Sequence, residues 1–208
     1  MSKAVRTISL AILTSAFAGL AAAQAVGNPG GSQPAPRRPA QAADDKEPLD
    51  HPNWLSPFVA TPARVVDAAL ELAGAGGNDV VYDLGSGDGR IILAAAQKFR
   101  AKAVGIEWNQ ELCQETSLEI QRLGLEDQVK IIQGDIFAQD LSAASVVTGY
   151  LMPKAWERLG PILKRQLKPG TRVISINDPI PGWPVEEMKR LGEEPEGFAW
   201  TLYLYRVR

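Results

Sequence analysis

A short stretch at residues 82–90 combines an acidic side chain, three glycines and a basic side chain. It reads Tyr-Asp-Leu-Gly-Ser-Gly-Asp-Gly-Arg, with Asp83 two positions ahead of Gly85, Gly87 and Gly89. Glycines at alternate positions let the backbone turn sharply and pass close to a ligand, and a following helix presents free N–H groups. An anion beside such a loop suits a positively charged ligand better than a pyrophosphate. The stretch therefore predicts a binding loop for a cationic small molecule.

Two familiar phosphate-binding patterns do not fit this loop. The dinucleotide fingerprint G-x-G-x-x-G needs glycine at position 90, where the chain has Arg90, and the pattern G-x-x-x-x-G-K-[ST] is missing. A nucleotide held by its pyrophosphate is therefore not the expected ligand.

A second acidic side chain, Glu107, closes the next apolar stretch of the sequence. Carboxylates at the ends of neighbouring strands repel each other unless a ligand or hydrogen-bond donors satisfy them. We therefore interpret Asp83 and Glu107 as a ligand-binding pair in preference to two structural caps. Asp135, after the third apolar stretch, has two interpretations, a ligand contact or a helix cap.

Alternating strands and helices must position these residues. Apolar, β-branched runs predict strands at 79–84, 103–107, 129–133, 145–149 and 171–176. Helical spacing predicts helices at four places: after Thr61; over 91–99; between Asn109 and Gly124; and over 153–167, with a break at Gly160 and Pro161. Thr61 has two interpretations, a helix cap or a contact with the ligand. One short helical turn is expected within 134–144. Repeated strand–crossover–strand units predict an α/β fold with a doubly wound, mostly parallel sheet.

The carboxyl-terminal part is expected to add two antiparallel strands. Residues 198–207 alternate bulky side chains as a strand does, whereas 185–191 fit either a helix or a strand. The turn residues of 192–197 favour a hairpin.

Composition excludes several classes of protein. The 208 residues are 45% hydrophobic and 22% charged, with a formal net charge of −2, which fits one globular domain and gives no basic excess for nucleic-acid binding. The single cysteine, Cys113, excludes an internal disulfide and a cysteine-rich zinc site, and the single histidine, His51, excludes a multi-histidine metal centre. We therefore expect a metal-free protein that does not bind nucleic acid.

Residues 1–23 have the pattern of a secretory signal peptide. Lys3 and Arg6 precede an apolar run from Ile8 to Leu20, and three alanines end the segment at Ala23. An uncleaved membrane anchor is the alternative, but this run is short for a span of about 20 apolar residues. We expect export to the periplasm, with no stable membrane span after cleavage.

Residues 24–51 are rich in Pro, Gly and Ala and have almost no large apolar side chains. Such a segment cannot bury enough surface to offset its ordering entropy, so a disordered linker is predicted. The folded domain is expected over 52–208.

The glycine-rich loop resembles motif I of the class I S-adenosylmethionine-dependent methyltransferases. Glu107 after the second strand, Gly134-Asp135-Ile136 after the third and Leu167-Lys168-Pro169-Gly170 before the fifth follow in that family's order. The resemblance implies a seven-stranded Rossmann-like methyltransferase sheet and S-adenosyl-L-methionine as cofactor. It implies these cofactor-binding residues: Asp83, Gly85, Ser86, Gly87, Gly89, Glu107, Asp135 and Ile136.

Within this superfamily the chain is similar to the lysine methyltransferases of the ATP synthase subunit c and adenine nucleotide translocase type. The block from Asp83 to Ile91 resembles their motif I, and the loop Tyr150-Leu151-Met152-Pro153 resembles the one after their fourth strand. Gly182-Trp183 is similar to a tryptophan site after their fifth strand. An export-type leader replaces their membrane segment, and Asn177-Asp178-Pro179 falls where relatives vary, so the acceptor is not carried over.

The resemblance implies direct in-line attack of an acceptor nitrogen or oxygen on the sulfonium methyl group. Such transfer requires alignment and partial desolvation more than an acid–base pair, and the sequence identifies no general base. A lysine acceptor must arrive neutral, which a dry acceptor channel near Tyr150 and Pro153 favours. Tyr150 has a second interpretation, a core aromatic residue at the end of a strand.

Three functions remain open at this point. The first is an active methyltransferase that acts on a protein lysine or a small molecule. The second is an exported, non-catalytic module that binds S-adenosylmethionine or a related nucleoside. The third is an exported interaction domain that has kept the fold without the cofactor.

Overall fold

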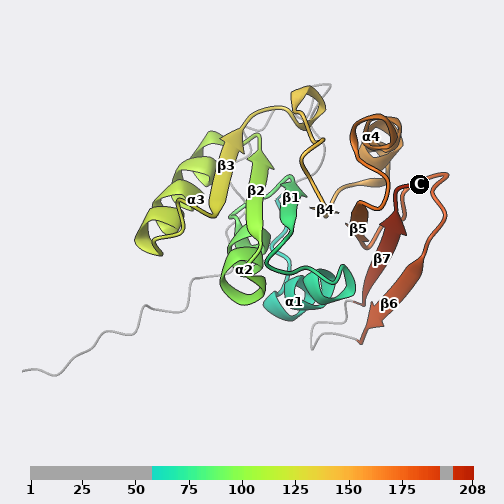
Figure 1. Ribbon diagram of the computed structural model, residues 1–208, viewed down its shortest axis with the longest axis horizontal. Coiled ribbons are helices and arrows are strands. Elements are labelled where there is room, and N and C mark those ends of the chain that lie inside the picture. Colours follow the sequence, from blue (N-terminus) through green and yellow to red (C-terminus); the bar gives the residue numbers. More distant parts are fainter. Residues whose placement is uncertain (1–57, 193–198) are drawn as a thin grey trace, which may run out of the picture. The chain divides into compact units, whose positions relative to one another are not determined.

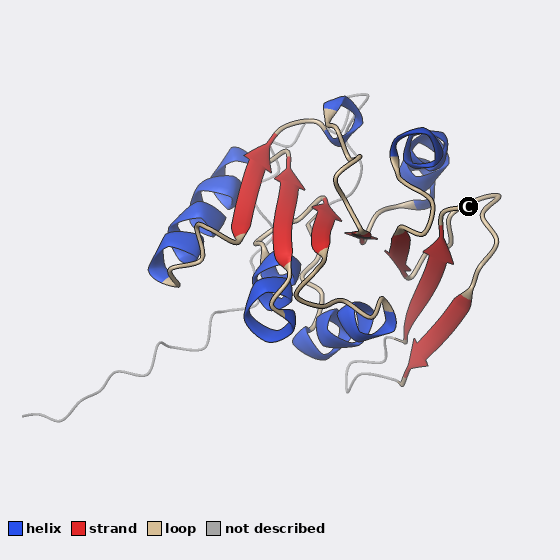
Figure 2. Cartoon of the chain, in the orientation of Figure 1, coloured by secondary structure: helices blue, strands red, loops and turns tan. Residues whose placement is uncertain are grey.

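The computed structural model describes residues 58–192 and 199–208. They form a seven-stranded sheet in the order β3-β2-β1-β4-β5-β7-β6, with helices against it (Figures 1 and 2). The strands are β1 (Val80–Leu84), β2 (Lys102–Glu107), β3 (Val129–Gln133), β4 (Val146–Gly149), β5 (Arg172–Ile176), β6 (Glu187–Leu191) and β7 (Trp200–Arg206). The helices are α1 (Ala63–Leu72), α2 (Arg90–Phe99), α3 (Gln110–Arg122), α4 (Pro153–Gln166) and the short 3-10 helix η1 (Ile136–Ala138).

The sheet is parallel except at its carboxyl-terminal side. Strands β1 to β5 pair in parallel, and β7 runs antiparallel to both β5 and β6. This arrangement confirms the predicted doubly wound sheet with its antiparallel carboxyl-terminal pair. The predicted signal peptide (1–23), the linker (24–51) and most of the expected turn (193–197) lie outside the described residues.

Two apolar clusters hold the helices against the sheet. The three helices α1, α2 and α3 contribute to one cluster, and α4 and η1 contribute to the other. All four residues of the central strand β4 are buried, as expected for a parallel strand covered on both faces. The first cluster includes Val66, Ile92, Ile120, Val81 and Ile174; the second includes Leu84, Val147, Trp156, Leu163 and Tyr205.

Helix α4 is continuous, so the predicted break at Gly160 and Pro161 is wrong. Pro161 lies on the exposed side of the helix, as does Glu157, whose carbonyl loses its partner N–H to the proline but stays open to water. Gly160 is buried, and a Cβ atom there would lie 3.1 Å from Nε1 of Trp183. The glycine therefore marks a close approach between α4 and the loop after β5. Burial of Trp156, Leu159 and Leu163 holds the helix together through the proline.

The start of α1 also differs from prediction, because Thr61 does not cap it. Pro62 occupies the N-cap position, and no side chain makes a capping hydrogen bond there. Thr61 is only 4% exposed, and its carbonyl accepts a hydrogen bond from Nη1 of Arg90 at 2.5 Å. This contact ties the segment before α1 to the first residue of α2.

Helix α3 begins and ends as predicted. The side chain of Asn109 accepts hydrogen bonds from the N–H groups of Glu111 at 2.8 Å and Leu112 at 3.2 Å, which satisfies donors of the first turn. Gly124, with φ of 64°, follows the last turn as a left-handed cap.

The strand order reverses beside β1, which has β2 on one side and β4 on the other. In open parallel sheets, ligands bind outside the carboxyl ends of the strands at such a reversal. The glycine-rich loop leaves β1 at this place, and the loops after β2 and β4 flank it.

Candidate active site

The glycine-rich loop turns back across the end of β2. The N–H groups of Gly85 and Ser86 both donate to the carbonyl of Ile106, at 2.9 and 3.0 Å. The three glycines of the loop have φ values of 74°, 55° and 76°, a region that residues with a Cβ atom rarely adopt. The loop conformation therefore requires glycine at these positions.

Close packing adds a second reason for two of these glycines. A Cβ atom on Gly87 would overlap the ring of Phe58, and one on Gly89 would overlap the side chain of Thr116. The segment before α1 and the helix α3 thus both approach the backbone of the loop.

Asp83 lies at the carboxyl end of β1 and is 2% exposed. Its Oδ1 atom accepts a hydrogen bond from the hydroxyl of Thr148 on β4 at 2.7 Å. Burial raises the pKa of Asp83 to about 7, opposed by the Thr148 hydrogen bond and reinforced by the carboxylates of Glu107 and Asp88. A ligand cation nearby would compensate the buried charge and lower this pKa again.

Glu107, at the end of β2, joins two loops. Its Oε2 accepts a hydrogen bond from the N–H of Gly87 at 2.8 Å, and its Oε1 accepts one from the N–H of Asn109 at 2.9 Å. Its charge also bears on Asp83, because it raises the pKa of that residue. The structure therefore brings together the two carboxylates that the sequence pairs, and it supplies hydrogen-bond donors to each.

The loop after β3 lies beside this pair. The N–H of Gly134 donates to the carbonyl of Glu107 at 2.8 Å. Asp135 caps η1 by accepting a hydrogen bond from the N–H of Phe137 at 2.9 Å. The helix-cap interpretation of Asp135 is therefore confirmed, and the residue lies where the ligand contact is predicted. Ile136 is only 5% exposed and packs in the core, so a cofactor contact by this residue would come from its backbone.

Sequence reasoning gave no role to Arg90, the last residue of the motif. Its Nε and Nη2 atoms donate to the two carboxylate oxygens of Asp88, at 2.8 and 2.5 Å, while Nη1 reaches the carbonyl of Thr61. This arginine therefore holds the segment before α1 against the glycine-rich loop. Its position in the motif was the available signal, but its partner lies 29 residues earlier in the chain.

A second group of side chains lies beyond β4 and β5. Tyr150 packs edge-on against Trp200, with ring centroids 5.4 Å apart, and its hydroxyl accepts a hydrogen bond from Nδ2 of Asn177 at 3.3 Å. Pro153, predicted beside Tyr150 in an acceptor channel, is exposed at the first turn of α4. Asn177 and Trp200 were not predicted as site residues, because only the folded sheet brings them to Tyr150.

Comparison with known proteins places this geometry in a family. Residues 83–187, from Asp83 past Glu107, Asp135 and Tyr150, match the ANTKMT methyltransferase domain. The chain belongs to this methyltransferase family. A protein-lysine N-methyltransferase from Saccharolobus islandicus is 43% identical over 152 residues, which are 73% of this chain and 93% of that protein.

Two further relatives are similar over different lengths. An adenine nucleotide translocase lysine N-methyltransferase from Mus musculus is 35% identical over 127 residues, and the chain spans only 55% of that protein. The crystal structure of an RNA methyltransferase from Salinibacter ruber in complex with S-adenosyl-L-homocysteine is 41% identical, with a TM-score of 0.66 over 72% of this chain and 94% of that one. The protein is therefore an S-adenosylmethionine-dependent methyltransferase with a Rossmann-like fold, as the motif resemblance implied.

The methyltransferase site fits S-adenosyl-L-methionine on physical grounds as well. The hydroxyl of Ser86 is buried and has no hydrogen-bond partner among residues 58–192 and 199–208, and a Cβ atom on Gly105 of β2 would lie 2.6 Å from it. The buried carboxyl of Asp83 has one hydrogen bond, from Thr148, and the charged groups that raise its pKa are the carboxylates of Glu107 and Asp88. Because the cofactor carries positive charge and hydrogen-bonding groups, it can satisfy both residues.

Cys113 takes no part in the methyltransferase site as a nucleophile. Burial, with a smaller contribution from Glu107, raises the pKa of its thiol to about 11, which disfavours the reactive thiolate. In the part of the chain that the structure describes, no group of three or more His, Cys, Asp or Glu side chains could hold a metal ion.

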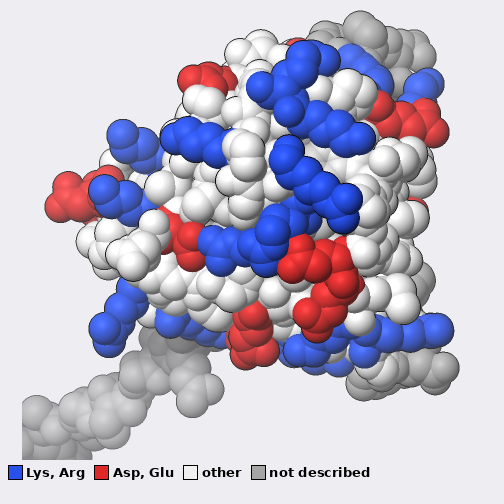
Figure 3. All heavy atoms as spheres, turned by 45° about the vertical axis from the view of Figure 1, so that its right-hand side comes forward, with Lys and Arg blue, Asp and Glu red and all other residues white. Residues whose placement is uncertain are grey.

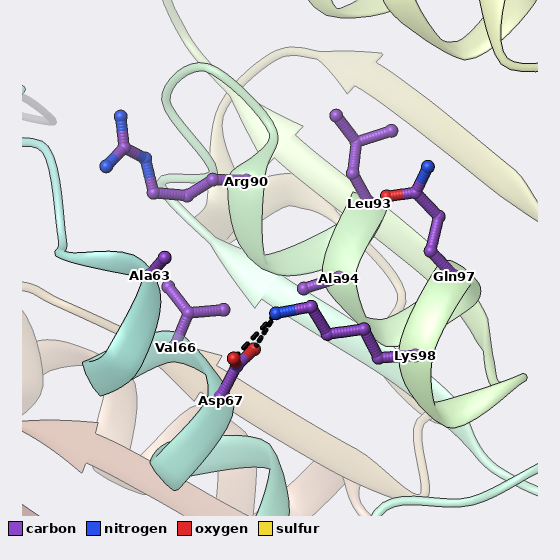
Figure 4. A pocket seen from close by; sticks show the side chains of 8 residues that line it. All are labelled: Ala63, Val66, Asp67, Arg90, Leu93, Ala94, Gln97 and Lys98. Carbon is purple, nitrogen blue, oxygen red and sulfur yellow. Dashed lines mark hydrogen bonds and ion pairs between the residues drawn. The ribbon is translucent and has the colours of Figure 1, made fainter.

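A surface hollow lies between α1 and α2 (Figure 4), and neither Asp83 nor Glu107 lines it. Lys98 donates to both carboxylate oxygens of Asp67 there, at 2.7 and 2.6 Å. Of the residues in the glycine-rich motif, only Arg90 lines it, so this hollow does not coincide with the predicted cofactor loop. The lining residues are Ala63, Val66, Asp67, Arg90, Leu93, Ala94, Gln97 and Lys98.

Proposed function

We propose that this methyltransferase transfers a methyl group to the side-chain nitrogen of a protein lysine. The observation that carries the proposal is the similarity to the archaeal protein-lysine N-methyltransferase, which extends over 93% of that protein. The similarity covers both the glycine-rich loop and the loop with Tyr150, so it supports a similar acceptor as well as a similar cofactor.

The chain's own residues would hold S-adenosyl-L-methionine from the carboxyl ends of β1, β2 and β3. When bound, the cofactor supplies an electrophilic methyl group on a sulfonium. Asp83 provides a negative charge for its cationic end, Glu107 provides a carboxylate for hydroxyl groups, and the glycine-rich loop lets the backbone approach closely. These residues bind and orient, and none of them has to accept a proton from the acceptor.

The acceptor nitrogen uses its lone pair to form the new bond to the methyl carbon, while the electron pair of the broken carbon–sulfur bond stays on sulfur. The nitrogen then releases one proton to water. Because only a neutral amine has this lone pair, a site beside the half-buried Tyr150 and the buried Trp200 favours the reaction by disfavouring the ammonium form.

Incubation with isotopically methyl-labelled S-adenosylmethionine and poly-L-lysine tests the proposal. We expect label in the polymer, release of S-adenosylhomocysteine in equal amount, and mono-, di- or trimethyllysine by mass spectrometry after hydrolysis. Poly-L-lysine that has been reductively dimethylated beforehand is the matched control and should accept less label. Failure to label poly-L-lysine by a sample that binds S-adenosylhomocysteine would contradict the lysine assignment.

RNA is a second candidate acceptor because the 41% identical structure is described as an RNA methyltransferase. Lys and Arg side chains also gather on the face of the molecule in Figure 3, with Asp and Glu among them. Both signs of charge occur together on α4 and β6, as in Arg165, Glu157, Arg190 and Glu187, which is a weaker match to phosphates than a uniformly basic surface. A total RNA arm in the same labelling assay distinguishes the two acceptors.

We also propose that the protein is exported through residues 1–23. The charged start, the short apolar run and the alanines before Gln24 support this proposal. Within residues 58–192 and 199–208, every helix is too short or too polar to cross a lipid bilayer. The intact mass of the protein from periplasmic and cytoplasmic fractions tests the proposal: a periplasmic form that starts at Gln24 supports cleavage, a form with an intact start in the membrane supports a tether, and a cytoplasmic form with Met1 contradicts export.

A further inference from the structure

We propose that Asn177 is a positioning residue that fixes the hydroxyl of Tyr150, whose oxygen then accepts an N–H of the acceptor amine and directs the nitrogen lone pair to the methyl group. This inference rests on the proposed lysine activity and extends it to a residue outside the loop of residues 150–153. It assigns a function to the first residues of β7, which support Asn177 and Tyr150.

Strand geometry places Tyr150 on the same side of the sheet as Asp83. Side chains alternate along a strand, and Val146 of β4 packs in the same apolar cluster as α1 and α2. Thr148, two residues later, contacts Asp83, and Tyr150, two residues later again, packs against that same cluster. The ring therefore lies just beyond β4, next to the strand that carries the cofactor loop.

Asn177 is fixed by three contacts with the neighbouring strand and with Tyr150. Its N–H donates to the carbonyl of Thr201 at 2.7 Å, and its Oδ1 accepts from the N–H of Thr201 at 3.0 Å. Because the backbone N–H of Thr201 can only donate, Oδ1 must face it, and Nδ2 must face Tyr150. The hydroxyl of Tyr150 is therefore the acceptor in its hydrogen bond with Asn177.

The backbone of Asn177 is suited to this role. Its φ is 66°, in the left-handed region, which Asn tolerates better than most residues with a side chain. This conformation ends β5 and lets both the backbone and the side chain of one residue bind Thr201. The adjacent Trp200 holds the ring of Tyr150 edge-on, so β7 supports both the ring and, through Asn177, the hydroxyl.

The hydrogen-bonding capacity of the Tyr150 hydroxyl determines how it can contact the acceptor amine. A phenolic oxygen has two lone pairs and one proton, and Asn177 occupies one lone pair. A donor to the amine nitrogen would occupy the electron pair that must attack the methyl group. The productive contact is therefore an N–H of the amine donating to the second lone pair of Tyr150, which leaves the nitrogen lone pair free for alignment.

A double-mutant cycle tests the inference, because a residue that acts through Tyr150 loses its effect when the hydroxyl is removed. We would measure kcat and KM with poly-L-lysine, and calorimetric affinity for S-adenosylhomocysteine, for Asn177→Gly, Tyr150→Phe and the double variant. We expect each single change to lower kcat about tenfold, the double variant to fall no further, and cofactor affinity to change less than about twofold. Glycine keeps the left-handed backbone at 177, so the variant tests the side chain.

Arg100→Gly is the matched control, since Arg100 also has a positive φ, of 59°, but lies between α2 and β2 at the opposite ends of the parallel strands. It should keep the wild-type kcat. Effects that multiply in the double variant, or a Tyr150→Phe variant with wild-type kcat, would overturn the role of Asn177. Absence of methyl transfer by the wild type, with S-adenosylhomocysteine still bound, overturns the lysine function first and this inference with it.

Discussion

Asp79 and Asp83 stand at opposite ends of β1 and have opposite surroundings. Asp79 accepts hydrogen bonds from Gly76 and Ser145 and pairs with the guanidinium of Arg172. Asp83 accepts one hydrogen bond from Thr148, and the ionisable groups that bear on it are other carboxylates. The amino end of the sheet thus neutralises its acid internally, whereas the carboxyl end leaves an acid for a ligand to neutralise. This difference separates a carboxylate that stabilises the fold from one that serves function.

The same contrast extends across the sheet. At the amino end, Arg172 of β5 also donates to the carbonyls of Ala73 and Gly74 after α1, at 2.8 and 3.0 Å, so one side chain fastens three segments. At the carboxyl end, the hydroxyl of Ser86 is left without a partner among the described residues. A buried polar group without a partner costs stability, and a ligand that hydrogen-bonds to Ser86 would remove that cost.

The largest effect is expected at the carboxyl end, from Glu107→Ala. The change removes the acceptor for the N–H groups of Gly87 and Asn109 and the carboxylate assigned to the cofactor. We expect S-adenosylmethionine affinity to fall about 100-fold in calorimetric titration, with the circular dichroism spectrum preserved. Glu111→Ala, which removes an exposed carboxylate in the first turn of α3, should bind as wild type. Wild-type affinity in the Glu107 variant would refute the assignment of this residue.

The next largest effect is expected at the amino end, from Asp79→Ala. Loss of this carboxylate leaves Arg172, whose side chain is 19% exposed, without its anion. We expect the free energy of unfolding in urea to fall by about 2 kcal/mol. Cofactor affinity of the folded fraction should stay at the wild-type value, and a large loss of affinity would erase the distinction between the two ends.

Asp83→Asn should have the opposite effect to Asp79→Ala, with greater stability and weaker cofactor binding. Both effects should depend on pH. The folded-state pKa of Asp83 is raised to about 7, so ionisation of this group costs folding free energy as pH rises from its unfolded value, near 4, through 7. The variant removes that cost and should be more stable than wild type at about pH 8, with a smaller difference at about pH 5.

Cofactor binding gives the second half of this test. A cationic ligand favours the ionised form of Asp83, so wild-type affinity for S-adenosylmethionine should rise between about pH 6 and about pH 8, with proton release on binding. Asp83→Asn should bind about tenfold more weakly at about pH 8 and lose this part of the pH dependence. Equal proton release by both proteins would show that another group titrates.

The smallest effect is expected from Lys98→Ala, which breaks the ion pair with Asp67 across the hollow between α1 and α2. The side chains of this pair are 53% and 33% exposed, so solvent screens their attraction. We expect a change in unfolding free energy below about 0.5 kcal/mol and no change in cofactor affinity. A loss of affinity would instead connect this hollow to the binding site.

The cofactor side of the site could be predicted from the sequence because its determinants are local, and the structure brings the predicted loop and carboxylates together. One short segment contains Asp83, the three glycines of the loop and the start of α2. The spacing of these residues and the conformational freedom of the glycines can be read from the sequence. Glu107 and Asp135 were predicted because each lies at or just after the end of a strand of the same parallel sheet. The alternation of strand and helix patterns along the sequence also predicted the fold.

The errors came from contacts between distant segments. A break at Gly160 and Pro161 was predicted from intrinsic preference, but the buried face of α4 and the approach of Trp183 outweigh it. Thr61 carries the pattern of a helix cap, yet its carbonyl instead binds Arg90. Local preference is worth about 1 kcal/mol per residue, and tertiary packing of a whole helix face exceeds it.

The sequence by itself determined the class of the fold and predicted a cofactor loop with acidic partners, because glycine conformation, charge and strand-end position depend on neighbours in the chain. Only the tertiary structure decided which residues meet beyond β4 and β5. Asn177 and Tyr150 are 27 residues apart, and Trp200 reaches them only because β7 runs antiparallel beside β5. Strand pairing is a cooperative, long-range choice, so no local pattern identifies the residues that it brings together.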